Sequence, residues 1–226
     1  MELPFPLTEY KQRLEKLRAS MERHGIDTVF ITSPENKYYF TGYQMVMPGG
    51  RIPTGFAFNR AEDNFIAFCE EDEEDLLQRT TIVEEMYLFG SEWGGGKSPY
   101  DVIISVLKKK GWLKGNVGVE MWTYYPSHQA FERLVSELRR EGANVVDVSK
   151  MINDIRFIKS PLELVYIRRA AEIADIGMKA AMEAIRPGVT ELDVVAEIES
   201  AMYHAGGERP AIMTMVESGP RSILQH

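Results

Sequence analysis

Hydrophobic positions in the first 150 residues follow two alternating patterns. Short apolar runs typical of buried strands occur at 27–32, 56–59, 65–69, 86–89, 117–120 and 145–148. Segments with helical spacing of apolar residues lie between or before them, at 8–24, 76–82, 99–110 and 126–140. Strands that alternate with helices, in units of about 30 residues, favour an α/β unit. The strand pair 56–59 and 65–69 flanks a polar turn and predicts a hairpin, so the sheet is expected to be mixed.

A long helix is predicted to begin a second unit. Ser160 is placed to cap it, Pro161 suits its first position, and Glu163 completes a Ser-x-x-Glu capping box. Charged residues then recur every three or four positions on one stripe, so we expect the rest of the circumference to be buried. Pro187-Gly188 ends the pattern. The boundary divides the chain into 1–158 and 159–226.

The remainder of the second unit is short. Thr190 and Asp193 predict a capped helix up to Gly206-Gly207, and the apolar run 210–216 predicts a strand. Two helices and one strand are too little for a self-contained domain. We therefore expect the second unit to be incomplete.

Composition narrows the class of partner and compartment. The hydrophobic content is 44%, the charged content is 27% and the formal net charge is -8, which argues against nucleic acid and anionic membrane as partners. A single cysteine, Cys69, excludes an intrachain disulfide and fits a reducing compartment. No signal peptide is visible, and no apolar run approaches the roughly 20 residues that span a bilayer. The sequence predicts a cytoplasmic protein.

Two local patterns bear on chemistry. The four histidines show neither His-x-His nor His-Glu-x-x-His spacing, so they form no zinc signature. The segment Ser91–Ser98 resembles a phosphate loop, but serine stands where the first glycine is required and Pro99 removes a backbone donor. A flexible loop before a helix is the better interpretation. ATP binding by Gly94–Ser98 remains an alternative that a nucleotide-binding assay tests.

A set of residues in fixed order carries a resemblance to a known family. The set comprises Arg156, Ile158-Lys159-Ser160-Pro161, Glu163, Ile167-Arg168, Ala170-Ala171, Arg186-Pro187-Gly188 and Glu191. It resembles the opening of the catalytic domain of the pita-bread metallohydrolases, which include prolidase, aminopeptidase P, creatinase and ectoine hydrolase-like enzymes. The resemblance covers essentially the whole chain. It implies a creatinase-like α/β domain with a mixed sheet over 1–158, then an incomplete α+β pita-bread domain over 159–226.

The resemblance implies a role for His226. Ser218-Gly219-Pro220, Ser222 and His226 resemble the family segment that brings a histidine into the active site. In peptidase members this histidine contacts the substrate or the tetrahedral intermediate, and in metal-free creatinase it is the general acid and base. Imidazole suits proton transfer because its pKa lies near neutrality.

Arg51 is the second site residue that the resemblance implies. It lies in the loop Tyr43–Gly55, which contains three glycines and two prolines. Creatinase-like members carry a Gly-Arg at a similar place, with slightly different spacing, and its guanidinium binds the substrate carboxylate in the partner subunit's active site. An arginine fork pairs bidentately with a carboxylate. A solvated loop arginine is the alternative.

The implied activity is hydrolysis of a C–N bond in a small-molecule or dipeptide substrate, either an Xaa-Pro dipeptide or a creatine- or ectoine-type compound, by a homodimer. Peptidase members hold two divalent metal ions with Asp, His and Glu ligands that all lie beyond the segment ending in His226. We therefore expect no metal in this chain, and no activity from it alone. The alternative is a non-catalytic module of the same fold that binds peptides or proteins.

Overall fold

Residues 3–44, 52–90 and 96–223 are described by the computed structural model, in which the chain divides into two units, Met1–Ile158 and Lys159–His226. The described strands of the first unit form one sheet in the order β4-β3-β2-β1-β5-β6. They are β1 (Thr28–Ile31), β2 (Gly55–Asn59), β3 (Ile66–Glu70), β4 (Glu85–Phe89), β5 (Asn116–Val119) and β6 (Asn144–Asp147). β2 is antiparallel to β1 and β3, and the other neighbouring pairs are parallel. The predicted mixed sheet and hairpin are confirmed.

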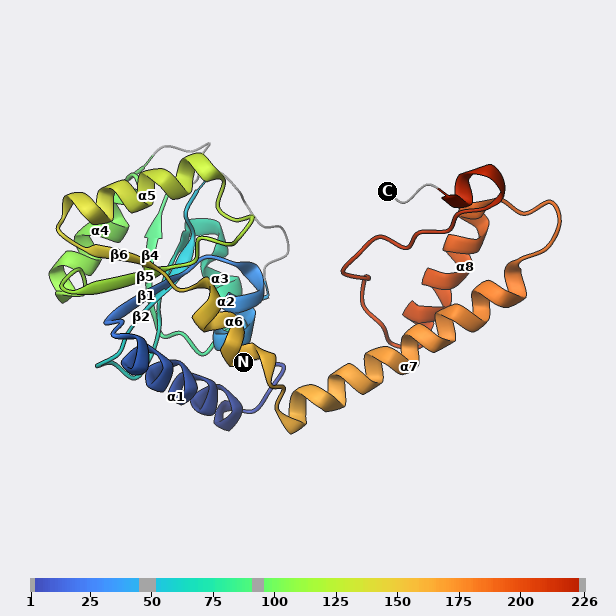
Figure 1. Ribbon diagram of the computed structural model, residues 1–226, viewed down its shortest axis with the longest axis horizontal. Helices are drawn as coiled ribbons and strands as arrows, with labels where there is room; N and C mark the ends of the chain where they lie inside the picture. Colours follow the sequence, from blue (N-terminus) through green and yellow to red (C-terminus); the bar gives the residue numbers. More distant parts are fainter. Residues whose placement is uncertain (1–2, 45–51, 91–95, 224–226) are drawn as a thin grey trace. The chain divides into compact units, whose positions relative to one another are not determined.

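Helices cover both faces of this sheet (Figure 1). They are α1 (Leu7–His24), α2 (Pro34–Thr41), α3 (Glu74–Thr80) after the 3-10 turn η1 (Glu71–Glu73), α4 (Pro99–Lys110), α5 (His128–Arg140) and α6 (Ser149–Phe157). Apolar side chains of α1, α2, α3 and α6 pack on one face, and those of α4 and α5 pack on the other. β1 shows the alternation, because Val29 and Ile31 belong to the first layer and Phe30 to the second. All three are fully buried, which makes β1 a central strand.

Local sequence signals explain where several elements end. Gly25 adopts a φ of 66°, in the left-handed region that favours glycine, and ends α1 where the sequence predicts. The Ser127 side chain accepts a hydrogen bond from the Ala130 backbone N–H and caps α5. α6 was not among the predicted helices.

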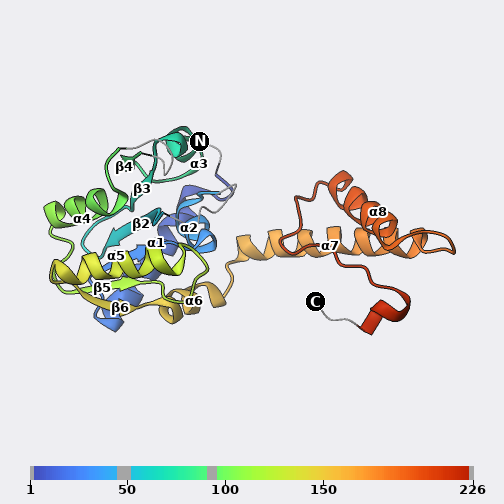
Figure 2. The same cartoon turned by 90° about the horizontal axis from the view of Figure 1, so that it is seen from above.

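The second unit contains two helices that lie side by side (Figure 2). α7 spans Pro161–Ala184, α8 spans Glu191–His204, and a 3-10 turn, η2, spans Gly219–Ile223. Both predicted capping boxes are present, at Ser160 with Glu163 and at Thr190 with Asp193. In each box the cap side chain accepts from the backbone three residues on, and the acid accepts from the cap backbone.

Two predictions for this unit are wrong. α7 is not largely buried, since only Ile173, Gly177, Ala181 and Ala184 are, and Val165 is 59% exposed. The reason is that α8 contacts one side of α7, and no other described element of this unit covers the rest. The run 210–216 is not a strand, because among the described residues of the unit no strand offers its backbone hydrogen bonds.

Among the described residues, each helix is too short or too polar to pass through a lipid bilayer.

Candidate functional site

The carboxyl ends of β1 and β5 meet at a change of direction in the sheet. The chain leaves β1 toward β2 on one side, and leaves β5 toward β6 on the other. In open α/β sheets, such a switch point is where ligands bind. The side chains at this point therefore decide whether a crevice is open there.

Glu120, directly after β5, fills the switch point. Its Oε2 accepts hydrogen bonds from the backbone N–H of Thr32 at 2.7 Å and of Ser33 at 2.9 Å. Its Oε1 accepts from Ser33 Oγ at 2.8 Å and from Asn36 Nδ2. All these side chains are buried. A carboxylate of the protein thus occupies the N-terminus of α2, where the helix dipole favours negative charge.

Arg156 extends this network to α6. Its guanidinium donates to Asn36 Oδ1 at 2.8 Å and lies 5.9 Å from the Tyr39 ring centroid. The switch point is therefore closed by the protein's own side chains. The side chains at the switch point hold α2 in place.

A group of five residues lies around the end of α2, the start of β2 and the end of β3. We call Lys37, Tyr43, Thr54, Cys69 and Glu73 the loop-stem cluster. Lys37 Nζ donates to Thr54 Oγ1 at 3.4 Å and lies 5.7 Å from the Tyr43 ring centroid. Tyr43 Oη donates to Glu73 Oε1 at 2.6 Å. Glu73 follows β3, so the cluster joins the carboxyl ends of β1 and β3 to the start of β2.

Burial sets the protonation of the loop-stem cluster. Desolvation lowers the pKa of Lys37 to about 8, against the opposing charges of Glu73 and Glu120. Desolvation, followed by the hydrogen bond to Glu73, raises the pKa of Tyr43 far above its usual value. Desolvation raises the pKa of Cys69 to about 12, so the thiol is neutral near pH 7 and is no nucleophile.

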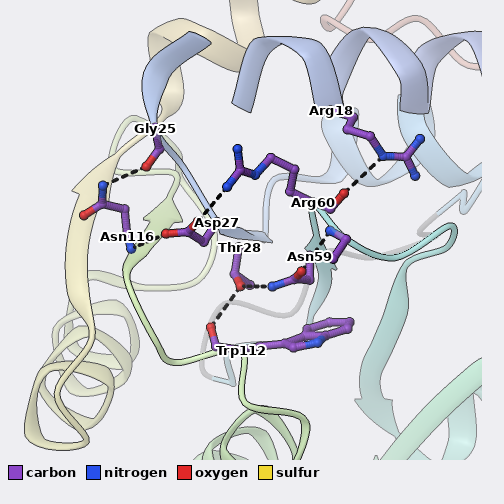
Figure 3. Close-up of polar contacts among 9 residues, drawn as sticks. Arg18, Gly25, Asp27, Thr28, Asn59, Arg60, Trp112 and Asn116 are labelled. Carbon is purple, nitrogen blue, oxygen red and sulfur yellow. Dashed lines mark hydrogen bonds and ion pairs between the residues drawn. The ribbon is translucent and has the colours of Figure 1, made fainter. Parts of the chain in front are cut away.

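A second polar network fixes the opposite end of β1 (Figure 3). Asp27 Oδ1 pairs with Arg60 at 3.0 Å, and Asp27 Oδ2 accepts from the Asn116 backbone at 2.9 Å. Thr28 Oγ1 donates to the Trp112 carbonyl at 2.9 Å and accepts from Asn59 Nδ2. These bonds join β1, β2 and β5. We therefore assign this end of the sheet a structural role.

Both predicted site residues, Arg51 and His226, lie outside the described residues. The segment before His226 is described as far as η2, and the backbone N–H and Oγ of Ser218 donate to Glu191 Oε1 at 2.7 and 3.0 Å. Ser218 is thereby fastened to the first turn of α8. Most of the phosphate-loop segment Ser91–Ser98 is also outside the description, and α4 begins with Pro99 as predicted.

The described residues do not fit a metal ion. Over 3–44, 52–90 and 96–223, no three His, Cys, Asp or Glu side chains are grouped closely enough to hold one. Sequence reasoning missed Lys37 and Glu120. A local signal existed for Glu120, which directly follows a buried strand, whereas Lys37 resembles any helical lysine.

Comparison with known proteins decides the family. Residues 13–158 match the Creatinase/Prolidase N-terminal domain, which is more than half of the chain. The chain belongs to the creatinase/prolidase family. Residues 165–226 match Metallopeptidase family M24, so a second family match follows the first with a gap of only a few residues.

Relatives within the creatinase/prolidase family are hydrolases by name. The chain is 30% identical to an ectoine hydrolase of Halomonas elongata, over 99% of this chain and 58% of that protein. It is 32% identical to an Xaa-Pro dipeptidase of Pyrococcus furiosus, over 96% of this chain and 55% of that protein. The solved prolidase from Pyrococcus furiosus superposes with a TM-score of 0.72 at 29% identity, over 94% of this chain and 59% of that one. The chain thus spans little more than half the length of these relatives.

Proposed function

We propose that the chain is the N-terminal domain, 1–158, and the beginning of the pita-bread catalytic domain, 159–226, of a hydrolase that cleaves a C–N bond in a small substrate. The substrate is an Xaa-Pro dipeptide or a creatine- or ectoine-type compound. The observation that carries the proposal is the pair of consecutive family matches in this chain, at 13–158 and 165–226. The names of two relatives, an ectoine hydrolase and an Xaa-Pro dipeptidase, agree with it.

Two residues of this chain take roles in the proposal. Arg51 binds the substrate carboxylate in the active site of a partner subunit, which requires a homodimer. The described residues on either side of its segment, Tyr43 and Thr54, lie at the carboxyl edge of the sheet, where loops commonly carry site residues. His226 contacts the substrate and transfers a proton, which imidazole does readily near neutral pH.

The remaining groups belong to a longer protein of cytoplasmic location. Two divalent metal ions are implied for peptidase members, where they activate a water molecule. The described residues of this chain do not fit such ions, so their ligands would come from the rest of the catalytic domain. The 226-residue chain should therefore be inactive alone.

The test uses the protein extended through the rest of the catalytic domain, assayed with Xaa-Pro dipeptides, ectoine and creatine. We expect turnover of one class and none by residues 1–226. Arg51→Ala should raise KM for an anionic substrate, because truncating one partner of a buried charge pair costs about 2–5 kcal/mol. Arg23→Ala, at an exposed position of α1, is the matched control.

Two results would overturn parts of the proposal. No turnover in any class, together with peptide or protein binding, would favour the non-catalytic module. Unchanged kinetics in Arg51→Ala would make Arg51 an ordinary loop residue. Sedimentation of the extended protein measures the homodimer directly.

A further inference from the structure

The carboxylate of Glu120 is bound in the way that a free carboxylate ligand would be. Its two oxygens accept four hydrogen bonds, from the backbone N–H groups of Thr32 and Ser33, from Ser33 Oγ and from Asn36 Nδ2. An ionised carboxylate offers about four lone-pair positions, so these donors satisfy it. Glu120, Ser33 and Asn36 are at most 4% exposed. The donors come from the end of β1 and from α2, whereas the carboxylate comes from the end of β5.

Arg156 fixes the direction in which the Asn36 amide faces. Its Nη1 donates to Asn36 Oδ1 at 2.8 Å, while Asn36 Nδ2 donates to Glu120 Oε1. A guanidinium cannot accept a hydrogen bond, and an ionised carboxylate cannot donate one. Turning the amide over would therefore lose both bonds. The donor that faces the carboxylate depends in this way on a side chain of α6.

Positive charge on several elements favours a negative ligand at this place. The buried Lys37 ammonium interacts with the charge of Glu120. Arg156 acts from α6 through the Asn36 amide, and α2 directs the positive end of its dipole toward its N-terminus. Hydrogen bonds from such donors to an ionised acceptor are about twice as strong as those between neutral groups. The donor set therefore suits the two oxygens of one carboxylate.

We propose that Thr32, Ser33 and Asn36 form a binding site for a small monocarboxylate, and that Glu120 is its internal ligand. Acetate matches the site, because its two carbons and two oxygens are the heavy atoms that Glu120→Ala removes. Since Glu120 belongs to the same chain, its effective concentration is high, and free carboxylates do not displace it in the wild type. The bound carboxylate joins β5 to α2 and, through Asn36 and Arg156, to the last turn of α6. The proposal does not depend on the proposed function.

Restoration of Glu120→Ala by acetate tests the site on the 226-residue chain. Without acetate, amides of α2 should exchange faster than in the wild type, and the urea midpoint should be lower. Sodium acetate should reverse both changes, and at ten times its Kd it should raise the folded-to-unfolded ratio about tenfold. Sodium chloride at the same ionic strength should have no effect. Sodium butyrate, which is two carbons longer than acetate, should have none either.

Matched variants show where acetate acts. Glu120→Gln fills the space with an amide, so its urea midpoint should not respond to acetate. Adding Asn36→Leu to Glu120→Ala removes a donor and should abolish the response. Adding Arg156→Met instead should weaken the response, because the Asn36 amide is then free to turn. Glu132→Ala, at an exposed position of α5, should behave as the wild type does.

Equal urea midpoints of Glu120→Ala in acetate and in chloride would overturn the proposal. An acetate response that survives Asn36→Leu would overturn it too, because acetate would then act elsewhere. If Glu120→Ala stays unfolded in both salts, a double-mutant cycle of Glu120→Gln and Asn36→Leu decides. Coupled effects on the free energy of unfolding would support the site, and additive effects would contradict it.

Discussion

Lys37 illustrates how the burial of a single charge makes stability depend on pH. Its ammonium bridges Tyr43 and Thr54, yet desolvation lowers its pKa from 10.5 to about 8. The lowered pKa means that the folded protein holds the proton less tightly than the unfolded chain does. The cost of burying the charge is complete below pH 8, and it disappears as the pH rises from 8 to 10.5.

The Lys37→Met variant should therefore be more stable than the wild type at pH 7, by up to about 3 kcal/mol. From pH 8 to 10.5 the folded wild type gives up its proton before the unfolded chain does, so the gap should close. The raised pKa of Cys69 lowers the stability of both proteins from pH 9 to about 12, and the Lys37 charge itself acts on this thiol. The part of the gap that closes between pH 8 and 9 is therefore the part assigned to Lys37. Urea unfolding at pH 7, 9 and 10.5 measures it. Lys150→Met, at an exposed position of α6, is the control, and its gap should not depend on pH. A pH-independent gap for Lys37→Met as well would contradict the assignment.

At the scale of elements, the contact between α7 and α8 depends on a glycine, Gly177. A Cβ on Gly177 would lie 2.8 Å from Met202 Cγ and 3.2 Å from Ile198 Cγ2, both on α8. The two helices approach closely at this point because glycine leaves the space free. The small apolar cluster of Ala181, Ala184 and Val194 lies on the same pair of helices.

Gly177→Val should separate the helices locally. Forcing a branched side chain into a packed contact costs about 1–3 kcal/mol, which exceeds the gain in helix propensity. We expect faster hydrogen exchange in α8. Ala174→Val, at an exposed position of α7, keeps the branched side chain without the contact and should leave α8 unchanged. Equal exchange in both variants would show that the close approach is unimportant.

At the scale of the whole molecule, the two units differ in how much core each contains. The first has buried apolar layers on both faces of its sheet. In the described part of the second, the buried cluster holds Ala181, Ala184 and Val194. A core of that size is far below what stabilises an independent domain.

Residues 1–158 should therefore unfold cooperatively as an isolated fragment, and residues 159–226 alone should lack a cooperative transition. Phe157 is 75% exposed at the end of α6, so chymotrypsin should cleave there in the intact chain and separate the two units. Urea titration of both fragments and mass analysis of the digest provide the measurements. A stable core well inside 1–150 would mean that the division is placed wrongly.

Sequence patterns predicted the elements whose signals are local. The capping box of Ser160 with Glu163 and the Gly25 stop depend on residues within one turn, and both are present. The run 210–216 has strand composition, but a strand forms only beside another strand. The prediction that α7 is largely buried was wrong for a similar reason. The spacing of charged residues shows which stripe of the helix is solvated, but it cannot show what covers the other faces of the helix.

The chemistry at the carboxyl edge of the sheet was less predictable. Glu120 binds Ser33 and Asn36, which are more than 80 positions away in sequence. The pKa of Lys37 is lowered by burial and opposed by the charge of Glu73, and its Nζ donates to Thr54 Oγ1; both residues lie far from it in sequence. Such contacts are created by the topology of the sheet, and no spacing within one segment encodes them. Arg51 and His226 came from resemblance, and their roles stay predictions.

The position of β1 between β2 and β5 also orders events during synthesis. Thr28 pairs with Asn59 of β2 on one side and with Val117 of β5 on the other. Of these two neighbouring strands, β5 therefore leaves the ribosome long after β2. Until then the partial sheet of β1 to β4 presents an open edge at β1, which is the kind of surface that attracts other chains and chaperones. β5 closes that edge when it pairs with β1. Glu120 directly follows β5, and its carboxylate then accepts hydrogen bonds from the backbone N–H groups of Thr32 and Ser33. The nascent chain is thus most exposed to misassembly between the emergence of β4 and that of residue 120.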